Sequence, residues 1–450
     1  MSTTTLEQNN WVTRVLGFDI DAVLARQDQG KAPDPSPDPS PDPSGAPSEA
    51  SGQDQAKGGF FDFIKQKVGE TVGSRPPLPK DKDLAKALED LDDQIAAVQA
   101  LGFDTKRLEE DRWDCAWSGD KAEKLTGDAR GKALTGVKAR IANVMSHAKS
   151  LADSSKSVMG DSKDPPTKTQ KSAIYKKALE DHYGITIENT AGTPNTHLDR
   201  VFDMFGTVPL ADANQDKLKK LLYLSTISAG GGAYNSSELA IKMGDFGDAS
   251  ASEAYEIDGK VLDANSFDVT TLHEIGHAVD AKHGIMTNSS NYTKAGCGGW
   301  DVESVDKITI VYLAEMKKTA GLSKGVDEAA LTTAISAALS SGSTAKPDAI
   351  AQADWVKALK FLTEKCLAIR AANSPWFKNQ VIVGGRVYQE AYGGRWYSYS
   401  SAARESTKVN KYQWRAPGEW FAEVYAITWL KKMKPPSAVD AAVAQYMWNG

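Results

Sequence analysis

The 450-residue chain is poor in the residues that build disulfide frameworks, membrane spans and nucleic-acid surfaces. It has three cysteines, an odd and widely spaced set without a Cys-x-x-Cys pair. This pattern argues against a disulfide framework and against a thiolate metal site. Reduced, buried thiols are the simpler interpretation, and they fit folding in the cytoplasm. No run reaches the roughly 18 apolar residues of a transmembrane helix, so we expect no membrane span.

An excess of positive charge is also missing. The chain carries 59 acidic and 53 basic residues, a net charge of −6, which argues against nucleic acid as its main partner. Residues 1–10 are polar and lack a basic segment followed by an apolar one, so we expect no signal peptide. We therefore expect synthesis in the cytoplasm and, for any role outside the cell, export by a dedicated secretion system.

Changes in composition, together with Pro- and Gly-rich segments, divide the chain into four predicted parts. Residues 1–26 form a short docking or leader segment, and residues 27–82 a disordered linker rich in Pro, Asp and Ser. Residues 83–160 form a small helical domain, because Leu84, Leu88 and Leu91 begin a series of apolar residues at helical spacing. Residues 165–450 form the largest domain.

Helical and strand signals mix in that last domain. Leu239, Ile241 and Met243 alternate with Ala240 and Lys242, which predicts a half-buried strand between glycine turn signals. A final helix is expected from about Pro417. The predicted fold class is α+β, mostly helical with a small mixed sheet.

Histidine is scarce as well, yet two of the six histidines stand in the segment His273-Glu-Ile-Gly-His277. Apolar residues flank them at helical spacing, with Ser266 or Asp268 as the expected helix cap. Two imidazoles one helical turn apart can bind one Zn²⁺, and Glu274 between them can take a proton from water without binding the metal. Gly276 predicts close packing against a neighbouring element.

A catalytic zinc takes a third protein ligand, and two candidates compete. His283 has the spacing of one zinc-peptidase class, although Asp280 stands where that class has a glycine that turns the chain. Glu419, in the first turn of the final helix, is the second candidate. If the first helix continues past Asp280, His283 points away from the site.

The run from His273 to Asp280, with Tyr412 and the segment Glu419-Trp-Phe-Ala-Glu423, resembles the catalytic domain of the anthrax lethal factor family. In that family a tyrosine precedes the third zinc ligand by seven residues. The resemblance implies a zincin-like domain over residues 165–450, with Glu419 as the third ligand and Tyr412 close to the metal. It covers two short blocks of the chain.

The function expected from these residues is zinc-dependent peptide hydrolysis with Glu274 as general base. Tyr412 would donate a hydrogen bond to the oxyanion, and Asp280 and Glu423 are candidates for orienting the imidazoles. The expected partners are a protein or peptide substrate and a secretion apparatus, because residues 11–19 resemble leaders of type VI secretion cargo. A secreted toxin or effector is therefore the leading hypothesis. A hydrolase of cell-wall peptides and a non-catalytic secretion adaptor with a zincin fold are the alternatives.

Overall fold

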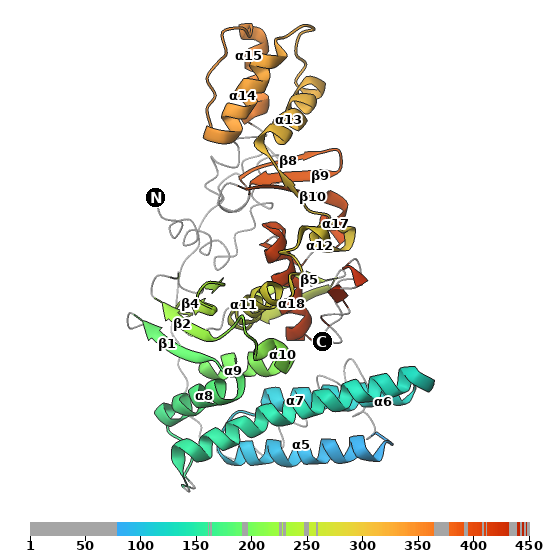
Figure 1. The fold of residues 1–450 in the computed structure, drawn as a ribbon, viewed down its shortest axis with the longest axis vertical. Coiled ribbons are helices and arrows are strands. Elements are labelled where there is room, and N and C mark those ends of the chain that lie inside the picture. Colours follow the sequence, from blue (N-terminus) through green and yellow to red (C-terminus); the bar gives the residue numbers. More distant parts are fainter. Residues whose placement is uncertain are drawn as a thin grey trace, which may run out of the picture.

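The computed structural model carries the chain as a single elongated molecule (Figure 1). It describes residues 79–447 except 161, 163, 191–196, 225–226, 228–230, 247–251, 258–259, 364–377, 391–394, 407–408, 411, 432–438, 442 and 445–446. The predicted leader and most of the predicted linker thus lie outside the described residues. The fold is α+β, mostly helical with small sheets.

Four helices make a layer at one end of the molecule, here called the helical base (Figure 1). They are α5 (Lys82–Ala100), α6 (Lys106–Glu123), α7 (Gly127–Met159) and α8 (Lys168–Tyr183). The Asp81 side chain caps α5 by accepting the Leu84 N–H at 3.0 Å. The apolar stripe predicted from the sequence is buried, with Leu84, Leu88 and Leu91 fully inaccessible. It belongs to a hydrophobic core that continues into the middle of the molecule.

The middle of the molecule holds a four-stranded sheet in the order β1-β2-β4-β3. Its strands are β1 (Thr186–Thr190), β2 (Lys220–Leu224), β3 (Gly232–Asn235) and β4 (Ala240–Met243). β1, β2 and β4 are parallel, and β3 pairs antiparallel with β4. The predicted strand is therefore confirmed from Ala240 onward, but it lies inside the sheet. Leu239 stays outside it, since its φ of 54° is incompatible with an extended strand.

Beside this sheet, two helices pack against each other: α11 (Ser266–His283) and α18 (Pro417–Lys431). A hairpin of β5 (Ser252–Ile257) and β6 (Lys260–Asn265) leads into α11. Asn265 caps α11, not the predicted Ser266 or Asp268, because its side chain accepts the N–H groups of Phe267 and Asp268. The Asp268 carboxylate instead binds Arg200 through two hydrogen bonds of 2.8 and 2.6 Å.

Gly276 explains how closely these two helices approach. A Cβ atom there would lie 3.1 Å from Ala422 Cα and 3.2 Å from Tyr425 Cδ1, both on α18. The sequence-based interpretation of this glycine is confirmed. Its missing side chain lets the backbone of α18 run directly over the face of α11 that carries the two histidines.

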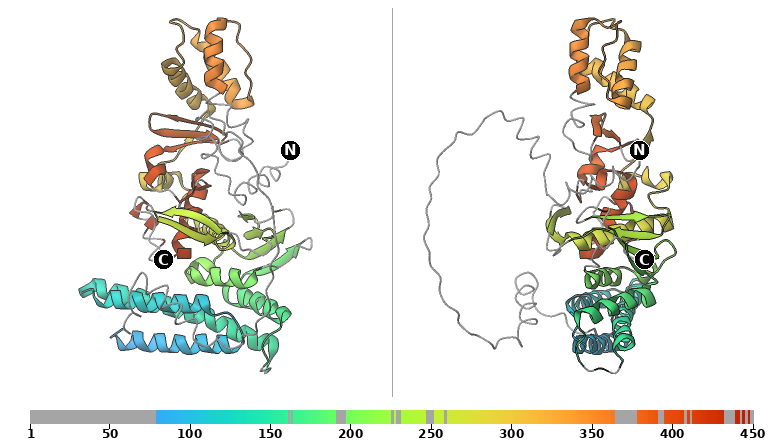
Figure 2. Two further views of the ribbon diagram at one scale, coloured as in Figure 1. Left: turned by 180° about the vertical axis from the view of Figure 1, so that it is seen from behind. Right: turned by 90° about the vertical axis from the view of Figure 1, so that its left-hand side faces the viewer.

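The far end of the molecule holds a second sheet and a separate helical cluster (Figure 2). The sheet order is β7-β10-β9-β8, with all its pairs antiparallel. Its strands are β7 (Asp301–Glu303), β8 (Lys378–Val383), β9 (Arg386–Glu390) and β10 (Trp396–Ser400). The cluster, here called the outer lobe, consists of α13 (Val305–Thr319), α14 (Glu328–Ser341) and α15 (Gln352–Leu362). Its apolar core is shared with the second sheet, through Tyr388 of β9 and Trp396 of β10.

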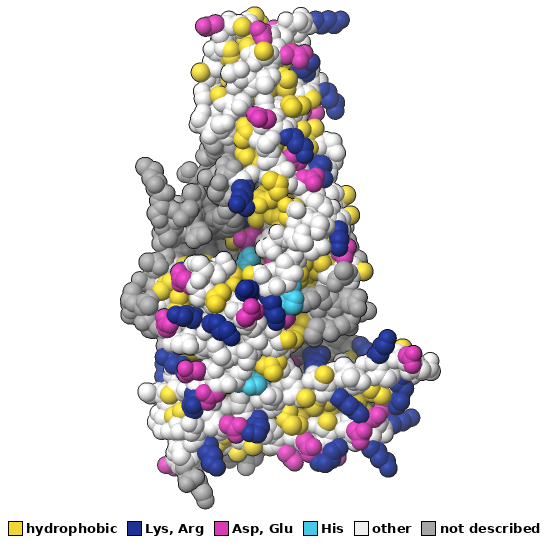
Figure 3. Space-filling view, viewed as in Figure 1, with side chains coloured by type: hydrophobic (Ala, Val, Ile, Leu, Met, Phe, Trp, Pro, Cys, Tyr) yellow, Lys and Arg dark blue, Asp and Glu magenta, His cyan; other side chains and the backbone are white. Residues whose placement is uncertain are grey.

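Short elements complete the described chain. They are α9 (Leu198–Thr207), α10 (Leu210–Ala213), α12 (Ser289–Tyr292), α17 (Ser401–Ser406) and the 3-10 turns η1 (Ala295–Cys297) and η4 (Tyr412–Trp414). On the face drawn in Figure 3, acidic and basic side chains are interspersed over the described surface. None of the described helices is both long enough and apolar enough to cross a bilayer.

Candidate metal centre

The two histidines of α11 face each other across one helical turn. Nε2 of His273 and Nε2 of His277 lie 3.0 Å apart, and the two rings are nearly perpendicular. His273 is buried, whereas the His277 side chain keeps 21% of its surface exposed. One imidazole is thus held inside the protein, and the other is partly exposed.

Helix α18 brings Glu419 to the same point from 146 positions further along the chain. Its Oε2 atom lies 3.0 Å from His273 Nε2 and 3.3 Å from His277 Nε2. The other predicted ligand, His283, is not part of this group. α11 runs unbroken to His283 and ends at Gly284, and the His283 side chain is exposed.

The three atoms form a triangle with sides of 3.0, 3.0 and 3.3 Å. Ligands bound at about 2.0–2.1 Å around a tetrahedral zinc lie about 3.3–3.4 Å from one another. Two imidazole nitrogens and one carboxylate oxygen are also a donor set that zinc uses at catalytic sites. The residues present therefore fit a zinc ion in both chemistry and spacing.

The electrostatics of this cluster favour positive charge. Burial opposes protonation of His273, but the carboxylates of Glu423 and Glu419 outweigh it and raise the pKa of His273 to about 10. Burial likewise opposes ionisation of Glu419, yet the neighbouring His277 and His273 hold the pKa of its carboxyl well below the usual range. Carboxylates that stabilise a proton on an imidazole also stabilise a metal cation bound to it.

Glu274 lies beside the cluster, against the sheet. One of its oxygens and the nitrogens of His273 and His277 all lie within 4.8 Å of one another. Two atoms crowd Gly232 of β3, since a Cβ added there would lie 2.9 Å from Glu274 Oε1 and 2.6 Å from Thr270 Cγ2. The strand backbone therefore rests directly on the Glu274 carboxylate, and this places the strand next to the histidines.

Tyr412, in the turn η4, also reaches the cluster. Its hydroxyl donates to Glu419 Oε1 at 3.3 Å, and its ring lies 5.7 Å from the ring of His273. Its side chain is half-buried, and the guanidinium of the buried Arg415 lies 5.5 Å from the centre of the ring. The structure thus brings Tyr412 to the same site as Glu419, His273 and His277.

The two carboxylates expected to orient the imidazoles differ. Glu423 is fully buried, and its Oε1 lies 3.1 Å from His273 Nδ1, an ion-pair distance in an oblique direction that does not meet hydrogen-bond geometry. Asp280 serves the turn after α11, where its Oδ1 accepts the N–H groups of Met286 and Thr287 at 2.5 and 3.4 Å.

Two residues that the sequence did not single out hold η4 in place. Asn410 contacts Glu423, and Gln389 of β9 donates to the carbonyl oxygens of Trp414 and Arg415 at 2.5 and 3.1 Å. Neither residue lies in a motif or a periodic pattern. Their roles arise from contacts between irregular segments, which local sequence signals do not record.

A cavity of about 780 Å³ opens beside the centre, next to Gly418. A Cβ added to Gly418 would lie 3.7 Å from the His277 ring and 3.9 Å from Asp280 Oδ2. β7 and β10 also line the cavity, through Val302 and Tyr397, which pair across these two strands. The second sheet therefore lines the same cavity as Gly418 and Asp280, while the two histidines are not part of its lining.

Comparisons with known proteins identified no relative of the chain. No model of a protein family matches the chain, and neither the curated proteins nor the solved structures contain a match to it.

Proposed function

We propose that the chain is a zinc-dependent endopeptidase with a zincin-like domain of the lethal factor type. One observation carries the proposal: Nε2 of His273, Nε2 of His277 and Oε2 of Glu419 converge within 3.0–3.3 Å from two helices that are distant in the sequence. In this proposal these three residues hold the zinc, and Glu274 and Tyr412 act on the substrate.

A bound zinc would supply a Lewis acid that polarises a peptide carbonyl and lowers the pKa of water toward about 7. Glu274, at 4% exposure, accepts the proton of the attacking water and passes it to the leaving nitrogen. The Tyr412 hydroxyl turns from Glu419 toward the carbonyl oxygen as that oxygen becomes negative, and donates a hydrogen bond to it.

Strand β3 is the natural site for the substrate backbone. Among the described strands it has a neighbour, β4, on one side only, and its first residue, Gly232, rests on Glu274. An extended peptide that pairs with such a strand gains backbone hydrogen bonds without any requirement on its sequence. Its scissile bond would then lie beside the general base.

The cellular role in this proposal is that of a secreted bacterial toxin or effector that cleaves a target-cell protein. It rests on the leader-like residues 11–19 and the Pro-Asp-Ser repeats that follow them. A chain that lacks residues 1–58 is expected to keep its peptidase activity and to lose export. Unchanged export of that chain would contradict the leader hypothesis.

The metal is tested by elemental analysis of the purified wild-type chain and of the variants Glu419→Ala and His283→Ala. We expect one zinc per wild-type chain, zinc retained in His283→Ala, and zinc lost from Glu419→Ala, since Glu419 Oε2 lies within 3.0–3.3 Å of both imidazoles. The His283→Ala chain is the matched control, because it removes an exposed side chain from α11, the helix that carries His273 and His277.

Three results would contradict the proposal in different ways. Loss of zinc from His283→Ala alone would transfer the third ligand to that residue. A wild-type chain that stays free of zinc after reconstitution would remove the peptidase hypothesis. If the chain binds zinc fully and cleaves cell-wall peptides but no protein, the cell-wall hydrolase alternative is favoured. If it binds zinc fully and cleaves nothing, the adaptor alternative is favoured.

A further inference from the structure

The side chain of Asn410 joins two parts of the site that are separate in the sequence. Its Nδ2 donates to Glu423 Oε2 at 2.6 Å, and its Oδ1 accepts the N–H of Gln413 at 2.9 Å. The first contact reaches into α18, and the second holds the turn that carries Tyr412. The Asn410 amide therefore bridges the buried carboxylate behind His273 and the η4 turn in front of it.

The orientation of the Glu423 carboxylate, which Asn410 contacts, depends on what holds its second oxygen. Glu423 is fully buried, and its Oε1 approaches His273 Nδ1 obliquely at 3.1 Å. A carboxylate in that position can rotate about its last torsion, which is broad, unless its second oxygen is held. The short bond from Asn410 holds that oxygen and so selects the orientation in which Oε1 faces the imidazole.

We propose that Asn410 is a positioning residue of the metal centre: through Glu423 it orients His273 toward the metal. This inference rests on the proposed zinc site and deepens it. Residues that orient a metal-binding imidazole from behind typically change metal affinity by about 10–100-fold when they are removed. Asn410 acts one residue further out, so we expect an effect of about 10-fold.

A purely structural role for Asn410 predicts a different pattern of zinc affinities. If Asn410 served only to hold η4, loosening η4 from its other side would have the same effect on the metal. Gln389 provides that control, since its side chain binds the carbonyl oxygens of Trp414 and Arg415 at the end of η4. The variant Gln389→Leu removes this support and leaves the Asn410–Glu423 bond in place.

The decisive single variant is Asn410→Asp in the full chain. It keeps an oxygen that accepts the Gln413 N–H, but it replaces the donor that faces Glu423 with a second carboxylate oxygen. At pH 8 we expect zinc affinity, measured by competition with a chelator, to fall about 10-fold. The visible spectrum of Co²⁺ bound in place of zinc should also change, because it reports the geometry of the ligands. Gln389→Leu should change both readouts less than Asn410→Asp does.

A reversed pair provides the rescue. In the double variant Asn410→Asp/Glu423→Gln, the new amide at 423 can donate to the new carboxylate at 410, so the bond is restored in the opposite direction. We expect zinc affinity to recover from the value of Asn410→Asp alone. Failure to recover, or equal losses in Asn410→Asp and Gln389→Leu, would overturn the positioning role.

These readouts separate the inference from the function on which it rests. Equal zinc affinity of the wild-type chain and the Asn410→Asp variant would overturn the inference and leave the peptidase proposal standing. Zinc binding that depends on Asn410, in a chain that hydrolyses no peptide, would overturn the peptidase proposal and support the inference. Wild-type chain without zinc affinity would overturn both.

Discussion

Two buried histidines, His273 in the metal centre and His147 in the helical base, show how strongly surroundings decide what an imidazole can do. Both are almost inaccessible, at 2% and 3% exposure. The pKa of His273 is raised to about 10, whereas burial lowers the pKa of His147 to about 3. Equal burial thus accompanies opposite preferences for charge.

The neighbours account for the difference. The ring of His147 stacks on Phe202 with 3.9 Å between ring centres, and its Nδ1 lies 2.6 Å from the Tyr183 hydroxyl. A methyl group on Gly206 would lie 2.5 Å from its Nε2, so α9 closes that side. His147 is a neutral core residue with one polar partner, and His273 is surrounded by the oxygens of Glu419 and Glu423.

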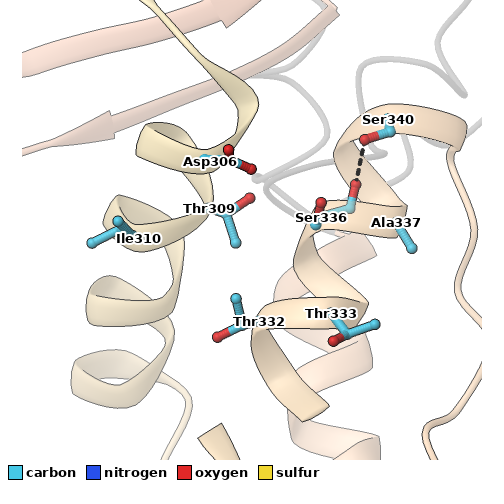
Figure 4. A pocket seen from close by; sticks show the side chains of 8 residues that line it. All are labelled: Asp306, Thr309, Ile310, Thr332, Thr333, Ser336, Ala337 and Ser340. Carbon is cyan, nitrogen blue, oxygen red and sulfur yellow. Dashed lines mark hydrogen bonds between the residues drawn. The ribbon is translucent and has the colours of Figure 1, made fainter. Parts of the chain in front are cut away.

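The outer lobe shows a third kind of environment. Its cavity, about 590 Å³ between α13 and α14, is lined mainly by hydroxyl and small side chains, with Asp306 as its one ionisable group (Figure 4). A hollow surface alone therefore does not mark a reactive site in this molecule. The proposed site rests instead on the convergence of imidazoles and carboxylates, which together favour positive charge.

The largest expected effect concerns Glu274, which in the proposal takes a proton but does not bind the metal. Glu274→Gln keeps the shape of the side chain and removes its basicity, so zinc content should stay at the wild-type level. Peptide hydrolysis should fall by about 10²–10⁴-fold, the typical contribution of a general base. Glu180→Gln, at an exposed position on α8, is the matched control. Hydrolysis by Glu274→Gln at the wild-type rate would rule out Glu274 as the base.

A smaller effect concerns the neutral histidine. Because the pKa of His147 is about 3 in the folded chain and about 6.5 when unfolded, the unfolded chain takes up the proton first as pH falls. Its stabilising contribution is complete above pH 6.5 and decreases below it, by about 2 kcal/mol at pH 5. Arg107 and His182 add to this shift.

Urea unfolding of wild type and His147→Gln at pH 7 and pH 5 measures this contribution. The loss of stability between the two pH values should be about 2 kcal/mol smaller in the variant. Asp203, whose pKa burial raises to about 8, works in the opposite direction. Its contribution and that of the metal centre cancel, since both chains contain them. Equal pH dependence in the two chains would show that His147 accepts a proton in the fold.

The smallest effect compares two helical glycines. Gly276→Ala places a methyl group 3.1 Å from Ala422 Cα, so overpacking should outweigh the gain in helix propensity and destabilise the chain by about 1 kcal/mol. Gly136, in α7, has no atom within 4 Å of an added Cβ. Gly136→Ala should therefore stabilise the chain by up to about 1 kcal/mol. Equal shifts in the two unfolding midpoints would show that α11 and α18 are not in tight contact.

Local signals predicted the parts of the centre that lie on regular helices. The apolar spacing around His273 indicated the helix, and Pro417 marked the start of the second one. The choice of Glu419 over His283 came from the resemblance to the lethal factor family. The outcome at Asp280 was open in the sequence, since the residue either turns the chain or continues the helix. In the structure its carboxylate accepts amides of the following turn, and α11 continues to its end.

Contacts between distant segments were not predictable in this way. Asn265 precedes the expected caps by one and three residues, and the Asp268 carboxylate binds Arg200 of another helix instead of capping α11. The strand next to Glu274 proved to be β3, because a short hairpin places Gly232 beyond the strand with the clearer apolar pattern. Such choices depend on the partners available in the folded chain rather than on local propensity.

The 146 positions between His273 and Glu419 have a consequence for the cell that makes this protein. A ribosome adds about 5–20 residues per second, so roughly 7–30 s pass between the synthesis of the two halves of the proposed centre. During that interval the nascent chain carries both histidines but not the carboxylate that completes the triangle. The order of the segments along the chain therefore delays completion of the proposed metal centre until helix α18 has been synthesised.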